Sequence, residues 1–146
     1  MAEYQEGSHS RYYLKIHVVW ITKYRKKVLL GDIPKRVREL ILEICLANDV
    51  QIVKGHVSAD HINLLISYPP HLSVSKLVQY LKGKSSRKML QEYTELRKKF
   101  WGQHIWARGY FTVSTGTVTD EVIKAYIENQ NKDEMKDEDF KIEDVL

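Results

Sequence analysis

The sequence is poor in cysteine and proline, and it contains no long apolar run. Because Cys45 is the single cysteine among 146 residues, the chain cannot form an internal disulfide. No stretch approaches the roughly 18 apolar residues that a membrane-spanning helix needs, and residues 1–10 are polar where a signal peptide would be apolar. These absences predict a cytoplasmic globular protein without membrane association, and the length predicts a single domain.

Positive charge is concentrated in the part of the chain before residue 131. The formal net charge is +4, but residues 131–146 contain seven acidic residues and three lysines, which leaves +8 on residues 1–130. A basic body favours a polyanionic partner such as nucleic acid, although scattered surface lysines give the same total in proteins that bind no anion. We therefore predict one domain over residues 1–130 and an acidic, disordered tail over residues 131–146.

The apolar pattern predicts four strands and their connecting helices in the order β-α-β-β-α-β. The expected strands are residues 12–21, 50–57, 61–67 and 108–115, and the second and third are close enough for an antiparallel hairpin. Helices are expected from the Gly31–Pro34 turn to Asn48, after a cap at Ser73, over residues 91–100, and from a cap at Thr119 to Gln130. This order is typical of the α+β class, with a ferredoxin-like or RRM-like antiparallel sheet, helices on one face and an added C-terminal helix.

Four polar residues in two of these elements form a candidate catalytic site. His61 and Asn63 alternate with Ile62 and Leu64 on a strand, so the two polar side chains share one face of the sheet. Tyr126 and Gln130 are four residues apart and share one face of a helix. If the elements meet, His61, Asn63 and Gln130 can bind a metal ion while the Tyr126 phenol attacks, which is the arrangement that metal-assisted phosphodiester chemistry needs.

Five motifs in this chain resemble those of the TnpA-type single-tyrosine HUH transposases, the small IS200-like enzymes that move insertion sequences as single-stranded DNA. The resemblance covers about residues 12–130. It lies in His17-Val18-Val19-Trp20 with Thr22-Lys23-Tyr24-Arg25, in Ala59-Asp60-His61-Ile62-Asn63-Leu64-Leu65, in Leu81-Lys82-Gly83-Lys84-Ser85-Ser86, in Trp106 with Arg108-Gly109-Tyr110, and in Tyr126-Ile127-Glu128-Asn129-Gln130. Each motif alone is weakly specific, whereas five in the same order are strongly specific.

The resemblance implies a mechanism and a set of partners. Tyr126 would attack a DNA phosphate to give a 5′-phosphotyrosine and a free 3′-hydroxyl, with Mg²⁺ or Mn²⁺ at the scissile phosphate and no nucleotide cofactor. Such enzymes are homodimers that recognise single-stranded DNA hairpins near the ends of the element. Their active sites are completed in trans, so that Tyr126 of one subunit would meet His61 of the other.

The sequence departs from the family pattern at Asn63, where the motif has its second histidine. An amide oxygen is a hard ligand suited to Mg²⁺, so His61, Asn63 and Gln130 remain a reasonable ligand set. The alternative is a descendant that binds DNA hairpins but is catalytically impaired. A third reading, from the fold alone, is an RNA-binding module, but the strand at residues 61–67 has no aromatic residue for stacking on bases.

Basic and aromatic residues outside the site provide candidate DNA contacts. Those expected to follow phosphates are Lys23, Arg25, Lys82, Lys84, Arg87 and Arg108. Tyr12, Tyr13, Tyr24 and Trp106 can stack on unpaired bases or pack in the core. We leave His17, His56, His71 and His104 out of the site because their spacings match no ligand pattern with one another.

Overall fold

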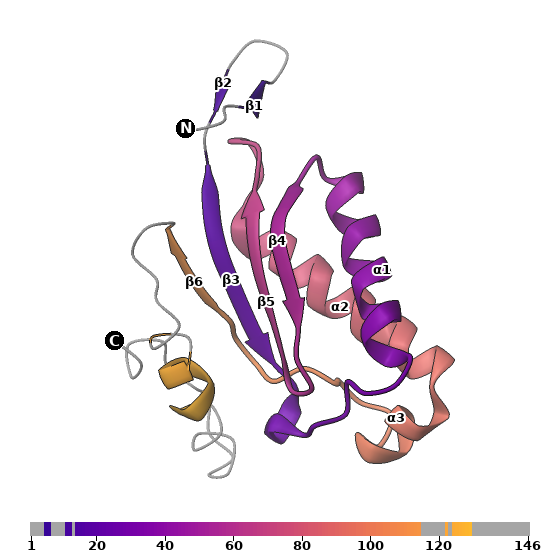
Figure 1. The fold of residues 1–146 in the computed structure, drawn as a ribbon. Helices are drawn as coiled ribbons and strands as arrows, with labels where there is room; N and C mark the ends of the chain where they lie inside the picture. The colour runs from indigo at the N-terminus through magenta and orange to yellow at the C-terminus, as the bar shows by residue number, and fades with distance from the viewer. Residues whose placement is uncertain (1–4, 7–10, 13, 115–121, 123, 130–146) are drawn as a thin grey trace.

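A four-stranded antiparallel sheet with two long helices on one face forms the centre of the protein (Figure 1). The structure is a computed structural model that describes residues 5–6, 11–12, 14–114, 122 and 124–129. The sheet has the strand order β4-β5-β3-β6, and a separate pair joins β1 (Gln5–Glu6) to β2 (Arg11–Tyr12). The four strands are β3 (Lys15–Ile21), β4 (Gln51–Val57), β5 (His61–Ser67) and β6 (Phe111–Ser114).

The helices begin close to where the sequence predicts. Helix α1 (Ile33–Ala47) has its proline in the first turn, and α2 (Val74–Glu92) begins after Ser73, whose Oγ accepts a hydrogen bond of 3.3 Å from the Lys76 amide. A short helix, α3 (Thr94–Lys99), and a 3₁₀ turn, η1 (Lys23–Arg25), complete the elements. The predicted α+β fold, with its β-α-β-β-α-β order over β3 to β6, is thereby confirmed.

The helix-covered face of the sheet carries the main core. Ile16, Val18 and Trp20 of β3 are buried there, as the alternating pattern predicts, together with the apolar stripes of both helices. Trp106 completes this core: its ring meets that of Trp20 edge-to-face at 5.8 Å, and its Nε1 donates to Ser85 Oγ at 2.9 Å. Since Trp106 is only 4% exposed, it packs in the core and does not stack on DNA bases.

Two strands are shorter than the sequence predicts. The first predicted strand is divided into β2 and β3, and the fourth begins at Phe111 instead of at residue 108. Residues just before β6 are held out of the sheet, because Gly109 adopts a positive φ of 78° and the Lys82 ammonium binds the carbonyls of Ala107 and Gly109, each at 2.7 Å. Within the described residues, no helix has both the length and the apolar character to cross a membrane.

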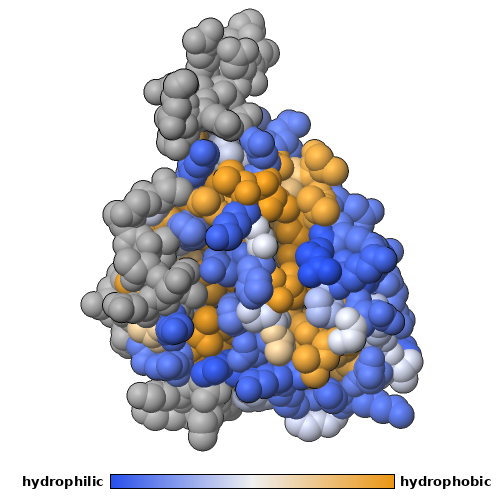
Figure 2. Space-filling view, in the orientation of Figure 1, coloured by the Kyte–Doolittle hydropathy of each residue, from blue (hydrophilic) through white to orange (hydrophobic). Residues whose placement is uncertain are grey.

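A second, smaller cluster is buried on the opposite face of the sheet, here called the open face. It comprises Val19, Ile21, Ala107, Phe111, Tyr126 and Ile127. The last two come from helical residues 124–129, which lie beside β6 on the side away from α1 and α2 (Figure 1). The helices cover one face of the sheet, and among the described residues the small cluster covers only part of the open face. Hydrophilic residues alternate with apolar patches in the space-filling view (Figure 2).

Candidate active site

Strand β5 places His61 and Asn63 together on the open face. Ile62, Leu64 and Ile66 are at most 2% exposed in the helix-side core, so the intervening side chains of His61, Asn63 and Leu65 project to the other side. All three are half-buried. The predicted shared face of His61 and Asn63 is therefore confirmed.

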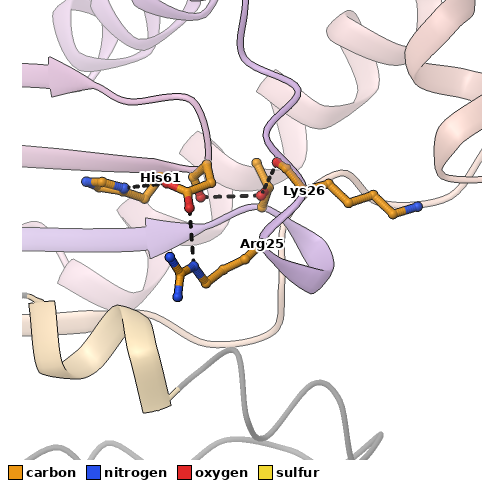
Figure 3. Close-up of polar contacts among 5 residues, drawn as sticks. Arg25, Lys26 and His61 are labelled. Carbon is orange, nitrogen blue, oxygen red and sulfur yellow. Dashed lines mark hydrogen bonds and ion pairs between the residues drawn. The ribbon is translucent and has the colours of Figure 1, made fainter.

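The His61 ring is oriented by a short chain of polar contacts (Figure 3). Its Nδ1 lies 2.8 Å from Asp60 Oδ1, and Arg25 Nε donates to Asp60 Oδ2 at 3.2 Å. Burial alone would raise the pKa of the Asp60 carboxyl, but the hydrogen bonds from His61 and Arg25 outweigh it and lower that pKa below its ordinary value of 3.8. An Nδ1–H that donates to a carboxylate leaves Nε2 with a lone pair, which is the tautomer a metal-binding histidine needs.

The turn η1 is fixed against the β4–β5 connection so that Arg25 reaches Asp60. Thr22 donates its amide to the Asp60 carbonyl at 2.9 Å and its hydroxyl to the Lys26 carbonyl at 2.8 Å. The backbone of Tyr24 and Arg25 is left-handed, with φ of 60° and 50°, a conformation that is uncommon outside glycine. Arg25, which we predicted as a phosphate contact, thus has its Nε engaged with Asp60.

Asn63 has two histidine neighbours that the sequence analysis left out. His56 of β4 is the direct cross-strand partner of Asn63, and His17 lies diagonally across from it on β3. Burial is the main cause that lowers the pKa of His17, with the Lys54 charge acting in the same direction and a hydrogen bond with the Asn63 side chain opposing both. No sequence spacing indicated this grouping, because the strand register creates it.

Tyr126 lies on the same sheet face, one strand away from the predicted ligands. Its side chain is fully buried, and its ring packs on Phe111 with centroids 5.4 Å apart. Val19 and Ile21, in the same cluster, are the β3 partners of Asn63 and His61. The fold therefore brings the tyrosine and two predicted ligands to one side of the sheet, whereas Gln130 lies outside the described residues.

The donor chemistry around β5 fits a hard divalent cation. The Asn63 side-chain oxygen is a hard donor of the kind that Mg²⁺ and Mn²⁺ prefer, and the His61 Nε2 adds one nitrogen donor. Among the residues that the structure describes, no three His, Cys, Asp or Glu side chains are grouped closely enough to hold a metal. A site here would therefore depend on Asn63 and on further donors such as Gln130.

The predicted phosphate contacts lie in three places. Lys84 and Arg87 are exposed on α2, and the Lys84 Nζ is 5.2 Å from the centre of the Tyr80 ring. Lys82, expected on the same solvated side, instead binds the carbonyls before β6 as described above. Lys82 and the exposed Arg108 line a cavity of about 350 Å³ between α2 and residues 104–110, and Lys23 lies in η1 beside Tyr24.

Comparison with known proteins decides the family. The model of the family described as Transposase IS200 like matches residues 10–130. The chain belongs to the IS200-like transposase family. It is 32% identical over 132 residues to the ISDra2 transposase TnpA of Deinococcus radiodurans, covering 90% of this chain and 94% of that one. It is also 32% identical over 142 residues to the IS200 transposase of Salmonella typhimurium, covering 97% of this chain and 93% of the relative.

Solved structures confirm the family fold. A crystal structure of a transposase candidate from Deinococcus radiodurans R1 superimposes with a TM-score of 0.76 at 30% identity and covers 86% of this chain and 97% of that one. A REP-associated tyrosine transposase, solved bound to a REP hairpin, has a TM-score of 0.54 at 13% identity, covering 90% and 74% of the two chains. The second likeness is one of fold alone. The resemblance that the five motifs indicated is thus confirmed.

Proposed function

We propose that this IS200-like transposase cleaves and rejoins single-stranded DNA at the ends of an insertion sequence, with Tyr126 as its nucleophile. The observation that supports this most is the placement of Tyr126 on the same sheet face as His61 and Asn63, within a cluster that includes their β3 partners. A phenol next to a cation site is a combination that suits attack on a phosphodiester.

The reaction needs one bond to form and one to break. The Tyr126 oxygen loses its proton and bonds to the DNA phosphorus, the bond from phosphorus to the 3′-oxygen breaks, and a proton passed on through solvent turns the leaving oxygen into a free 3′-hydroxyl. The bond energy is kept in the 5′-phosphotyrosine, so rejoining needs no nucleotide cofactor. A Mg²⁺ or Mn²⁺ ion held by His61, Asn63 and Gln130 would stabilise negative charge on the phosphate oxygens, and Asp60 would hold the His61 ring in place.

The DNA substrate that we infer is a single strand folded into a hairpin. The basic side chains proposed for its phosphates are Lys23, Arg25, Lys82, Lys84, Arg87 and Arg108. Lys84, Arg87 and Arg108 are the most exposed, whereas Lys82 and Arg25 already bind backbone carbonyls and Asp60. The REP-associated tyrosine transposase that shares this fold was solved bound to a REP hairpin. Binding to such a substrate would weaken steeply as salt rises, because the contacts release counterions.

We further propose a homodimer in which each active site is completed in trans. The Tyr126 side chain is 0% exposed against its own sheet, so DNA reaches the hydroxyl only if this contact opens or the helical residues 124–129 move to a partner. Mixing Tyr126→Phe with His61→Ala tests the arrangement, because only a trans site gives heterodimers one intact composite site. Failure of the mixture to regain activity, with subunit exchange confirmed, would reject it.

Covalent capture tests the proposed nucleophile. Incubation with a single-stranded hairpin DNA and Mn²⁺ should give a protein–DNA adduct on a denaturing gel. Tyr126→Phe should abolish the adduct and keep hairpin binding, because only the hydroxyl is lost. An adduct of undiminished yield in Tyr126→Phe would remove Tyr126 from this role.

A second candidate function is binding of DNA hairpins without cleavage. It is favoured by Asn63, which stands where the family motif has its second histidine. Under this reading the wild-type protein would bind the hairpin tightly, yet form no adduct at any Mg²⁺ or Mn²⁺ concentration. The same gel therefore separates the two functions.

A further inference from the structure

The most exposed aromatic side chain among the described residues lies in a loop that the proposed mechanism does not use. Trp101, which follows α3, is 77% exposed, whereas Trp20 and Trp106 are 0% and 4% exposed. Tyr24 of η1 is also exposed, at 41%. Single exposed rings are common on protein surfaces, whereas exposed rings that gather in one patch are typical of binding surfaces.

One ammonium group holds these two rings in a common cluster. The Lys26 Nζ lies 5.8 Å from the centre of the Tyr24 ring, 5.6 Å from that of Trp101 and 5.2 Å from that of the buried Phe100. It also donates a hydrogen bond of 2.9 Å to the Lys99 carbonyl. Residues 22–27 and 96–101 are thus joined at this point, and the two exposed rings share a cation.

The backbone at both rings is in a conformation that side chains disfavour. Tyr24 has a φ of 60° and Trp101 a φ of 52°, and a non-glycine residue in this region costs on the order of 1 kcal/mol or more. A glycine would remove that cost at either position. The chain instead carries its two exposed aromatic residues there, which indicates that the rings have a use in these places.

The two segments that carry the rings have charges of one sign. Residues 22–27 and 96–101 contain no acidic residue, and their basic residues are Lys23, Arg25, Lys26, Lys27, Arg97, Lys98 and Lys99. Lys23 Nζ is 5.4 Å from the Tyr24 ring centre. Stacking surfaces surrounded by cations match single-stranded nucleic acid, whose bases offer flat faces and whose phosphates are negative.

The cluster adjoins the candidate active site through the chain itself. Arg25, the residue after Tyr24, binds the Asp60 carboxylate, which in turn orients His61 (Figure 3). A nucleotide stacked on these rings would therefore contact the turn η1, whose Arg25 binds Asp60, on the side where the Lys26 side chain extends away from His61 (Figure 3). Duplex DNA would not bind in this way, because its base faces are already stacked.

We propose that Tyr24 and Trp101 form a stacking platform for an unpaired base of single-stranded DNA, with Lys23 and Lys26 beside its phosphates. The proposal rests on the proposed function for its substrate, and it adds a binding surface outside the catalytic residues. Base stacking on an aromatic side chain contributes about 1–3 kcal/mol, so loss of the Trp101 ring should weaken single-strand affinity about 5- to 150-fold.

Intrinsic fluorescence reports on this surface directly, because Trp101 is the exposed member of the three tryptophans. A 12-nucleotide oligo-dT added to the full-length Tyr126→Phe protein should quench the emission. An oligonucleotide of equal length with abasic residues should bind more weakly and leave the emission nearly unchanged, and a duplex should do the same. Equal quenching by the abasic strand would overturn the proposal in favour of attraction by charge alone.

Variants make the assignment specific. Trp101→Ala should abolish the quenching and weaken oligo-dT binding by the factor given above. Trp101→Tyr should keep most of the affinity because an aromatic ring remains. Leu46→Ala is the matched control, since Leu46 is 75% exposed on α1 and should have no effect. Unchanged affinity in Trp101→Ala overturns the platform. If Trp101→Ala in the wild-type background still forms the Tyr126 adduct, the proposed function stands without the platform. If the wild-type protein shows the base-dependent quenching but forms no adduct, the platform stands and the proposed function is refuted.

Discussion

The two faces of the central sheet differ in how they are covered, and the difference is clearest at adjacent residues of β3. Val18 and Val19 are both 0% exposed, but Val18 lies in the core beneath α1 and α2, whereas Val19 lies in the small cluster with Tyr126. The helix-side core is continuous across the sheet. The cluster on the open face covers β3 and β6 and ends before the polar side chains of β5.

This division explains why the candidate site lies where it does. A fully covered face would bury His61 and Asn63 where neither solvent nor substrate could reach them. An uncovered face would leave the Tyr126 ring without residues to pack against. Here the Tyr126 ring packs on the apolar half of the open face, over β3 and β6. The two predicted ligands lie half-buried on the polar half, over β5. The comparison can be tested by changing each part separately.

The largest effect is expected in the helix-side core. Trp106→Ala should lower the free energy of unfolding by about 3–5 kcal/mol, because it removes a buried ring packed on Trp20 and leaves Ser85 without the Nε1 donor. Urea unfolding followed by circular dichroism measures it. Trp101→Ala is the matched control and should change stability by less than about 0.5 kcal/mol. A loss below about 1 kcal/mol for Trp106→Ala would show that this core does not depend on the ring.

A smaller effect is expected at the residue that orients His61. Asp60→Asn should weaken Mn²⁺ binding about 10- to 100-fold. The neutral amide would hold the His61 Nδ1–H less strongly and would no longer balance the charge of Arg25. Calorimetric titration with Mn²⁺ measures the affinity. Asp49→Asn is a suitable control, since Asp49 is exposed after α1 and its φ of 58° is tolerated by asparagine. Equal affinities for Asp60→Asn and the wild type would mean that the polar chain serves the fold only.

The smallest expected effect is the difference in stability loss between truncation of Val18 and truncation of Val19. Val18→Ala should lower the free energy of unfolding by about 2 kcal/mol and Val19→Ala by about 1 kcal/mol, because the thinner cover over Val19 can shift to fill the space. The two urea midpoints, measured side by side, give the difference. A greater loss at Val19 would reverse the comparison between the faces.

Much of this fold follows from local patterns in the sequence. The alternation in β5, the Ser73 cap and the short 58–60 connection depend on neighbouring residues, and the structure bears each of them out. Alternation also identified His61 and Asn63 as neighbours on one face. It could not show what covers that face.

What the sequence did not reveal depends on contacts between distant segments. His17 and His56 approach Asn63 only through the register of three strands, and Lys82 leaves the solvated side of α2 because two loop carbonyls accept its hydrogen bonds. Asp60 appeared to be part of a polar turn, although its position directly before His61 was a usable signal. The roles of Tyr126 and Gln130 in catalysis stay predictions.

Covalent adduct formation as a function of Mn²⁺ concentration tests most directly whether the polar half of the open face serves the Tyr126 reaction. We predict an adduct in the wild type that disappears with EDTA, and a half-maximal Mn²⁺ concentration at least about tenfold higher in His61→Ala. Leu65→Ala, which changes the same face of the same strand, should behave like the wild type. An adduct that forms equally well in EDTA, or in His61→Ala with unchanged Mn²⁺ dependence, would contradict this account.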